Sequence, residues 1–402
     1  MTSLAAELEA AAQIGADGGG VSRFAWSPEL AQANAWLMRR LEELGLETEL
    51  DPAGNVFGRW DAGEGKAVLV GSHLDTVPRG GRYDGALGVL AALATVRAVR
   101  AEGVEPRRPL WVVSFNDEEG SRFQTGMLGS RAFCGELDLE DWRRRGVADA
   151  MARAGFDFDR LAEARRVARV GAYLELHIEQ GPVLEQSGED IGIVTAINGL
   201  LGFRVKLLGA ANHAGTTPMD KRRNALLAAS EIVLAVDRIV RARPGRQVGT
   251  VGRLAVRPGA PNVIPGEASF TVELRDLRTE TIESLWTTIE GEARAIVARQ
   301  GCTMEYVLRP PDRPALSDPR LRAVITSAAD ALGLRHLNLP SGAGHDAQEL
   351  ARIAPMGMIF VPSVDGISHS PQERSRPEEI ASGANVLMQA VLRLDQGALE
   401  KS

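Results

Sequence analysis

The stretch GSHLDTVPRGGRYDGALG, residues 71–88, decides which fold to expect, because it sets a histidine and two aspartates among many glycines. An apolar run, residues 67–70, precedes it, and an alanine-rich run, residues 86–99, follows it. This order predicts a buried strand, a loop and then a helix. Loops that follow buried strands in α/β proteins often carry the functional side chains, so this loop is the first candidate site.

Length and composition limit the class of protein. The chain has 402 residues, 44% of them hydrophobic and 25% charged, which predicts a globular protein of two domains. The net charge of -7 argues against a nucleic-acid partner. No segment is apolar enough for a membrane span, and the N-terminus lacks the features of a signal peptide. Because its two cysteines lie far apart in the sequence, a disulfide framework is not expected and the predicted location is the cytoplasm.

The hydrophobic pattern predicts an α/β domain. A helix is expected over residues 28–44, and buried strands are expected over residues 67–70 and 110–115 and from Tyr173. Alternation of strands and helices favours a mostly parallel sheet with helices on both faces. A charged insertion with helical character, residues 138–169, precedes the last of these strands, and we assign no function to it.

A second, inserted domain is expected after residue 198. Strands are predicted at residues 203–209, 247–256, 268–276 and 302–308, with helices at 224–240 and 280–299. This order of strand, helix, two strands, helix and strand is the ferredoxin-like one. The proline-rich segment 309–319 is a plausible return linker. The predicted domains are therefore residues 1–198 with 315–402, and residues 199–314.

Four histidines lie at predicted strand ends, in glycine-, proline- or acid-flanked segments: His73, His177, His213 and His369. Taken singly, each is more often a hydrogen-bonded structural residue than a ligand.

The segment NDEEGSRF adds three adjacent carboxylates, Asp117, Glu118 and Glu119, directly after an apolar strand. Such carboxylates repel one another unless a cation or solvent screens them, so a solvated loop and a metal site explain them equally well. Together with the HLD and RYDG segments, which add a histidine and two aspartates, a metal site becomes the better explanation of these carboxylates.

Imidazole and carboxylate ligands suit zinc, and also manganese, cobalt or nickel. Two such ions can share one bridging carboxylate and activate a water between them, with a free carboxylate as base.

Six motifs in sequence resemble one enzyme family: GSHLDTVPRGGRYDG, NDEEGSRF, LELHIEQGPVLE, NHAGTTPM, SGAGHDA and GISHSP. The chain resembles the two-metal amidohydrolases that include N-carbamoyl-L-amino-acid hydrolases, allantoate amidohydrolases and bacterial β-ureidopropionases, within a wider group of zinc exopeptidases and aminoacylases. The motifs extend over residues 73–371, nearly the whole chain. The resemblance implies a zinc-exopeptidase-like catalytic domain with an inserted ferredoxin-like domain that acts as a lid and forms a homodimer.

The resemblance also implies a role for each matching residue. His73 and His177 would bind one metal ion, Glu119 and His369 the other, and Asp84 would bridge the two. Glu118 would be the general base. Asp75 would orient a histidine ligand, although a turn-capping role explains it equally well.

Further residues are implied to contact the substrate: Gln180, His213, Asn262, Arg275, Gly344 and His345. His213 would stabilise the oxyanion and Arg275 would bind the substrate carboxylate. Three simpler roles stay open, since Gln180 could cap a turn, Arg275 could lie on an exposed strand, and His345 with Asp346 could cap a helix.

The implied reaction is hydrolysis of the ureido bond of N-carbamoyl-L-amino acids to the L-amino acid, CO2 and NH3. His177 favours this branch, because a carboxylate usually occupies its position in the related peptidases. Allantoate amidohydrolase is the nearest alternative, followed by β-ureidopropionase and aminoacylase. A non-catalytic binding protein with the same fold is the remote one.

Overall fold

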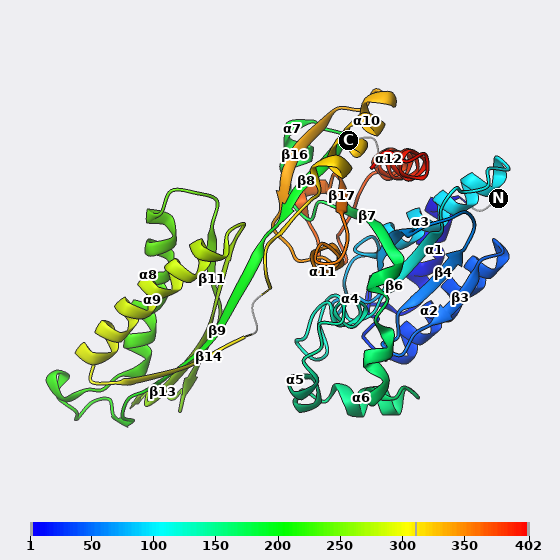
Figure 1. The fold of residues 1–402 in the computed structure, drawn as a ribbon. Helices are drawn as coiled ribbons and strands as arrows, with labels where there is room; N and C mark the ends of the chain where they lie inside the picture. Colours follow the sequence, from blue (N-terminus) through cyan, green and yellow to red (C-terminus); the bar gives the residue numbers. More distant parts are fainter. Residues whose placement is uncertain (1–2, 310–311, 400–402) are drawn as a thin grey trace. The chain divides into compact units, whose positions relative to one another are not determined.

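The computed structural model describes residues 3–309 and 312–399 (Figure 1). The chain forms two compact units, one of Met1–Ala196 with Leu316–Ser402 and the other of Ile197–Ala315. We call them unit 1 and unit 2. None of the helices among these described residues is long and apolar enough to cross a membrane.

Unit 1 contains a nine-stranded sheet with the order β15-β8-β17-β7-β5-β6-β4-β3, in which β16 pairs with β8. Its central strands β17, β7, β5 and β6 are parallel, whereas β8, β4 and β3 pair antiparallel toward the edges. The sheet is therefore mixed rather than mostly parallel. The difference arises at the edges, where short connections such as the turn between β3 and β4 reverse the chain.

The strands of this sheet are β3 (Glu47–Leu50), β4 (Val56–Trp60), β5 (Ala67–His73), β6 (Leu110–Phe115), β7 (Val170–Ile178), β8 (Ile191–Ile197), β15 (Ala315–Leu316), β16 (His336–Ser341) and β17 (Met356–Val361). The longer helices of unit 1 are α1 (Leu4–Gln13), α2 (Pro28–Glu43), α3 (Ala86–Ala101), α10 (Pro319–Ala331) and α12 (Pro377–Asp395). A small hairpin, β1 (Ala16–Asp17) with β2 (Gly20–Val21), follows α1. Shorter helices are α4 (Leu128–Cys134), α7 (Val183–Ser187) and α11 (Asp346–Leu350).

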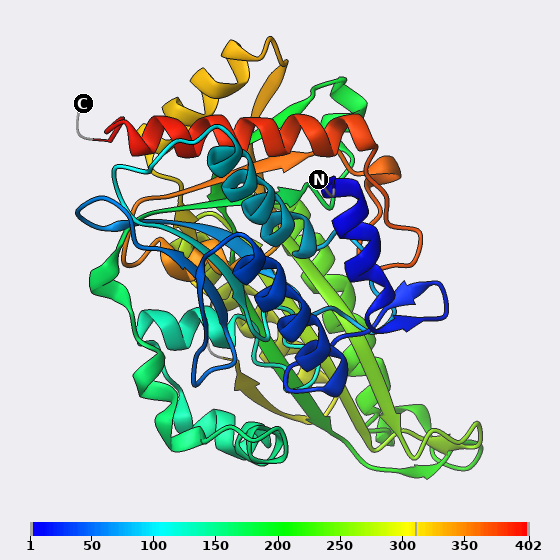
Figure 2. The same ribbon diagram turned by 90° about the vertical axis from the view of Figure 1, so that its right-hand side faces the viewer.

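One large apolar core joins these long helices to the sheet. Alternate strand residues such as Val68, Val70 and Leu174 pack with Leu90 of α3 and Leu387 of α12. Alternation follows from strand geometry, because successive side chains point to opposite faces. In Figure 2, α12, drawn in red, runs along the sheet beside the orange β17.

The insertion at residues 138–169 is helical, as its composition suggests. It contains α5 (Leu139–Arg144), α6 (Val147–Arg153) and two 3-10 helices, η1 (Phe158–Ala164) and η2 (Val167–Arg169). Trp142, Met151 and Leu161 form a separate apolar cluster with Trp26. The insertion thus packs against the loop before α2 within unit 1.

Unit 2 has a four-stranded antiparallel sheet with the order β11-β13-β9-β14. The chain runs β9 (Gly199–Leu208), α8 (Ala225–Ala242), β11 (Val248–Arg257), β13 (Glu267–Asp276), α9 (Thr279–Arg299) and β14 (Thr303–Leu308). This is the element order that the sequence predicts. Both helices cover one face of the sheet (Figure 1). A small two-stranded sheet, β10 (Asn212–His213) with β12 (Val263–Ile264), completes the unit, and the 3-10 helix η3 (Met219–Lys221) precedes α8.

Candidate metal centre

The parallel strands bring the motif residues of unit 1 to one edge of the sheet. His73 ends β5, Asp117–Glu119 follow the neighbouring β6, and His177 lies near the end of β7. The carboxyl ends of parallel strands meet at one sheet edge, so residues far apart in sequence become neighbours. Gly85, the N-cap residue just before α3, has a positive φ, and a Cβ at this position would overlap the His73 ring. The glycine lets this loop return beneath the histidine.

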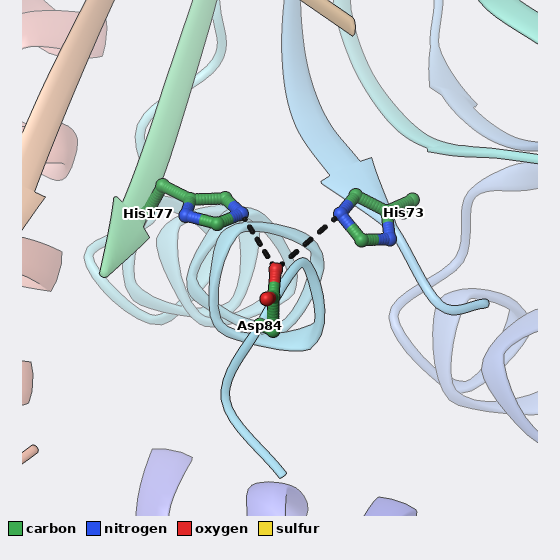
Figure 3. A group of neighbouring side chains, drawn as sticks. All are labelled: His73, Asp84 and His177. Atoms are coloured by element: carbon green, nitrogen blue, oxygen red, sulfur yellow. Dashed lines mark ion pairs between the residues drawn. The ribbon is translucent and has the colours of Figure 1, made fainter. Parts of the chain in front are cut away.

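Asp84 lies at the centre of the group. Its Oδ1 is 3.1 Å from His177 Nε2 and 3.7 Å from His73 Nε2. Figure 3 shows both imidazoles pointing at this carboxylate. Its Oδ2 is 3.3 Å from His369 Nε2, which is in turn 3.4 Å from Glu119 Oε2. Each oxygen of one carboxylate therefore faces a separate set of donors.

Two sets of three residues have ligand atoms close enough to hold a metal ion, His73 with Asp84 and His177, and Asp84 with Glu119 and His369. The structure thus brings together the five residues for which the sequence implies a ligand role. A third set, Glu175 with His177 and His345, is also close enough. The oxygens of Glu175 already accept hydrogen bonds from Ser72 and Tyr173, which makes this third set the poorest candidate.

Hydrogen bonds define which imidazole nitrogen faces the centre. The Nδ1 of His73 lies 3.0 Å from the Asp75 carbonyl oxygen, and the Nδ1 of His177 lies 2.9 Å from that of Ile178. A carbonyl oxygen can only accept, so each Nδ1 carries a hydrogen. The Nε2 atoms are therefore the positions that take either a proton or a cation, and this arrangement is typical of metal-binding histidines.

The electrostatics of the cluster favour a bound cation. Burial, together with the negative charges of Asp346 and Glu119, raises the pKa of Glu118 well above its usual range. Burial and the charge of Asp84 do the same to the pKa of Glu119. Burial alone lowers the pKa of His177, but the hydrogen bond and charge of Asp84 outweigh it and raise that pKa to about 9. Without a cation, the buried carboxylates repel one another and therefore retain protons more strongly, and His177 retains its proton as well. A bound cation would balance the same negative charges, so these pKa shifts are expected at a metal site.

The general-base candidate, Glu118, lies beside the first set of residues. Its Oε2 is 3.6 Å from His73 Nε2. Asp75 holds the backbone here, because its Oδ1 accepts the N–H of Glu118 at 3.2 Å and its Oδ2 accepts the N–H of Glu119 at 3.1 Å. Asp75 is buried, and its Oδ1 is also 3.7 Å from His73 Nδ1. One carboxylate therefore connects His73 to both glutamates, which is a larger role than orienting one imidazole.

Glu373 is a residue that the sequence reasoning missed. Its Oε1 accepts the backbone N–H groups of Tyr83 and Asp84 at 2.9 and 3.1 Å, and its Oε2 accepts the Ser368 hydroxyl at 2.8 Å. It thereby ties the loop of Asp84 to the loop of His369. An acidic residue four positions after the histidine of GISHSP was the available signal, but its partners lie about 290 residues away in the chain.

The substrate-contact candidates of unit 1 lie next to these groups. Gln180 donates from Nε2 to Asp84 Oδ2 at 2.8 Å, and its Oε1 is buried without a partner among the described residues. The His345 ring packs 4.6 Å from that of His177, and its Nε2 lies 2.9 Å from the Ser341 hydroxyl. His345 is the N-cap residue of α11, but its side chain makes no capping hydrogen bond to that helix. Gly344 lies beside it, near the Gln348 amide.

The remaining candidates belong to unit 2. His213 in β10 is exposed, and its Nδ1 accepts the backbone N–H groups of Gly215 and Thr216 at 3.0 and 3.1 Å. Asn262 lies close by, since its carbonyl oxygen accepts the N–H of Ala214 at 2.9 Å. Arg275 is on β13, on the face opposite the helices, with its Nη2 3.4 Å from Glu273 Oε2.

Comparison with known proteins identifies the family. The model of the peptidase family M20/M25/M40 matches residues 69–393. The chain belongs to this family. The family is metal-dependent, in agreement with the clusters described above. The predicted family resemblance and the prediction of an amidohydrolase are confirmed.

Individual relatives match over nearly the whole chain. An N-carbamoyl-L-amino acid amidohydrolase of Geobacillus stearothermophilus is 43% identical over 94% of both chains. A ureidoglycolate hydrolase of Oryza sativa is 37% identical over 93% of this chain and 80% of its own, and an allantoate amidohydrolase of Escherichia coli is also similar. Among solved structures, a hydantoinase/carbamoylase family amidase from Burkholderia multivorans superposes with a TM-score of 0.85 at 37% identity, covering 97% of this chain and 96% of that one.

Proposed function

We propose that this enzyme hydrolyses the ureido bond of N-carbamoyl-L-amino acids and releases the L-amino acid, CO2 and NH3. The single observation that carries the proposal is the arrangement around the Asp84 carboxylate. One of its oxygens faces His73 and His177, the other faces His369 beside Glu119, and the carboxylate of Glu118 lies next to His73. The relative with 43% identity, named for this activity, supports the choice of substrate.

His73 and His177 would hold one ion, Glu119 and His369 would hold a second, and Asp84, which belongs to both sets of residues, would contribute to holding each. The donor set suits zinc, manganese, cobalt or nickel, since it combines neutral imidazoles with carboxylates. When bound, two such ions lower the pKa of water and polarise the ureido carbonyl.

Glu118 then performs the proton transfers. Its carboxylate accepts a proton from the attacking water and later donates it to the nitrogen of the departing L-amino acid. The other product of this C–N cleavage is carbamate, which breaks down to CO2 and NH3. Asp75 keeps Glu118 in place through the backbone N–H groups of the two glutamates.

His213 has the tautomer that an oxyanion donor needs. Because its Nδ1 accepts two backbone N–H groups, the hydrogen of the neutral ring lies on Nε2, and His213 as a residue is exposed. We assign His213 Nε2–H and the neighbouring Asn262 amide to the substrate oxygens, and the Arg275 guanidinium to the substrate carboxylate.

The geometry of unit 2 favours a dimer in which two copies complete each site. His213 pairs with Val263, just before β13 begins at Glu267, whereas Arg275 lies near the other end of β13. The eight residue steps from 267 to 275 span about 26 Å of extended strand. A small substrate cannot reach both ends, so one chain would supply Arg275 and a second copy His213 and Asn262. The lid role and the cytoplasmic location likewise remain predictions.

A substrate panel tests the proposal. Metal-loaded enzyme is incubated with N-carbamoyl-L-amino acids, their D-enantiomers, N-carbamoyl-β-alanine, allantoate, ureidoglycolate and N-acetyl-L-amino acids, and ammonia and free amine are measured. The expected result is preference for the L-carbamoyl compounds. Turnover of allantoate or ureidoglycolate alone would show that one of these ureido compounds, and not an N-carbamoyl-L-amino acid, is the substrate. Amine release from N-acetyl compounds alone would make it an aminoacylase.

A further inference from the structure

Unit 1 contains a cavity of about 710 Å³ apart from the metal centre. Four segments line it: the loop into α2 with the first turns of that helix, the turn between β3 and β4, the loop after β6, and the turn at residues 153–156 of the insertion. None of the proposed metal ligands is among its described lining residues. Cavities of this size typically hold small molecules.

The walls of the cavity are largely apolar. The loop before α2 contributes Phe24 and Trp26, α2 contributes Leu30 and Met38, and the insertion contributes Phe156. Trp26 and Leu30 are buried, while Phe24, Met38 and Phe156 are half-buried. Aromatic and aliphatic side chains arranged in this way accommodate a ring-sized apolar group.

The charged groups that line the cavity are both cationic. Arg122 is anchored by donating from Nη1 to the carbonyl oxygens of Ala25 and Trp26 at 2.8 and 3.3 Å. The Arg153 side chain is exposed and makes no ion pair or hydrogen bond with any described residue. No carboxylate is among the described lining residues. Two guanidinium groups without a lining acid favour an anion and disfavour an ammonium group.

Within the described part of the chain, two buried polar atoms of the lining side chains lack a hydrogen-bond partner. They are the indole Nε1 of Trp26, a donor, and the amide Oδ1 of Asn116, an acceptor. Both side chains lie next to Gly54. A Cβ added at that position would be 3.3 Å from Trp26 Nε1 and 2.8 Å from Asn116 Nδ2. The absent side chain of this glycine leaves room beside the two groups. Buried polar groups without partners are uncommon and usually mark a missing ligand or water.

We propose that this cavity binds a small carboxylate that has an apolar ring and an amide group and no positive charge. The carboxylate would pair with Arg122 and Arg153, the ring would pack against Phe24 and Phe156, and the amide would satisfy Trp26 and Asn116. The class includes N-acylated amino acids. It excludes free amino acids, because their ammonium group would face two cations and no lining acid.

Binding of hippurate, measured by calorimetry with the full-length enzyme, tests this site. We expect hippurate to bind and its neutral carboxamide analogue to bind at least about tenfold more weakly, since one charge-assisted pair is lost. Arg153→Ala and the cavity-filling Ala35→Trp should each weaken hippurate binding by a similar factor. Arg39→Ala, which removes an exposed arginine of α2 outside the cavity, should leave it unchanged.

The outcomes separate this site from other places where a carboxylate could bind. If hippurate binds equally well to wild type, Arg153→Ala and Ala35→Trp, it binds elsewhere and the proposal is wrong. Absence of binding up to about 10 mM also overturns it. Thermal unfolding of each variant shows whether it has folded, and both substituted positions are exposed, so the wild-type transition should be retained.

Discussion

Replacing Asp75 by asparagine tests how the two adjacent glutamates are held. Both carboxylate oxygens act as acceptors, one for the N–H of Glu118 and one for that of Glu119. Asparagine offers one oxygen, so its NH2 group must face one of these backbone donors. The variant loses one hydrogen bond to a charged acceptor, which contributes about 1.5–3 kcal/mol, and places two donors against each other.

If that loss acts on the position of Glu118, kcat should fall about 10- to 100-fold, since 1.4 kcal/mol corresponds to a factor of ten. Global stability should change little, because burial raises the pKa of Asp75 and the neutral amide avoids the cost of a buried charge. The assay is ammonia release from an N-carbamoyl-L-amino acid, with metal content measured by mass spectrometry and unfolding followed by circular dichroism.

A control away from the metal centre is Asp395→Ala, which removes the Oδ1 that accepts the backbone N–H groups of both Arg107 and Arg108. This variant should keep its full kcat. Wild-type kcat in Asp75→Asn would refute the reasoning. Equal losses of kcat in both variants would also refute it, since they would indicate a general effect of losing a carboxylate that accepts two backbone N–H groups.

Four further predictions concern single groups. Glu118→Gln should keep its metal content and lose about 100- to 10,000-fold in kcat, and an active variant would exclude Glu118 as the base. Arg275→Ala should raise KM with little change in metal content, and Arg275→Lys should restore only part of the loss, because lysine cannot bind a carboxylate bidentately. Glu373→Ala should lower metal affinity about 10- to 100-fold, measured by competition with a chelator, while Glu373→Gln keeps an acceptor and should lose less. The metal-free protein should lose thermal stability as the pH rises from 7 through 9, because the folded-state pKa of His177 is raised to about 9 and the protonated form supplies the stabilisation; His177→Gln should remove this dependence.

Where the signal is local, the sequence predicts the strands well, and it predicts which polar residues lie at their carboxyl ends. The run before His73 and the run before Asp117 are both short, apolar and followed by polar residues, and both are strands with those residues at their carboxyl ends. The metal-ligand candidates meet because parallel strands share that edge. The sequence also predicts the strand and helix order of unit 2, whose apolar residues alternate clearly along β13.

Long-range hydrogen bonds were not predictable in the same way. Nothing in the sequence near Glu373 indicates that its carboxylate meets the backbone of Tyr83 and Asp84, and Asp75 showed only the signal of a turn or an imidazole partner. The antiparallel pairing of β8 with β17 was not predicted either, because a strand buried on both faces has the same apolar pattern whether its neighbour runs parallel or antiparallel. The cavity beside α2 arises from segments that are far apart in the sequence, and no single motif marks it.

The most direct test of the central claim is a product balance for N-carbamoyl-L-methionine with the metal-loaded enzyme. The account predicts equal amounts of L-methionine and ammonia, loss of both after chelation, and recovery of both when zinc or manganese is returned. The same yield from chelated, metal-free enzyme, or no methionine from an enzyme shown to contain two ions, would contradict it.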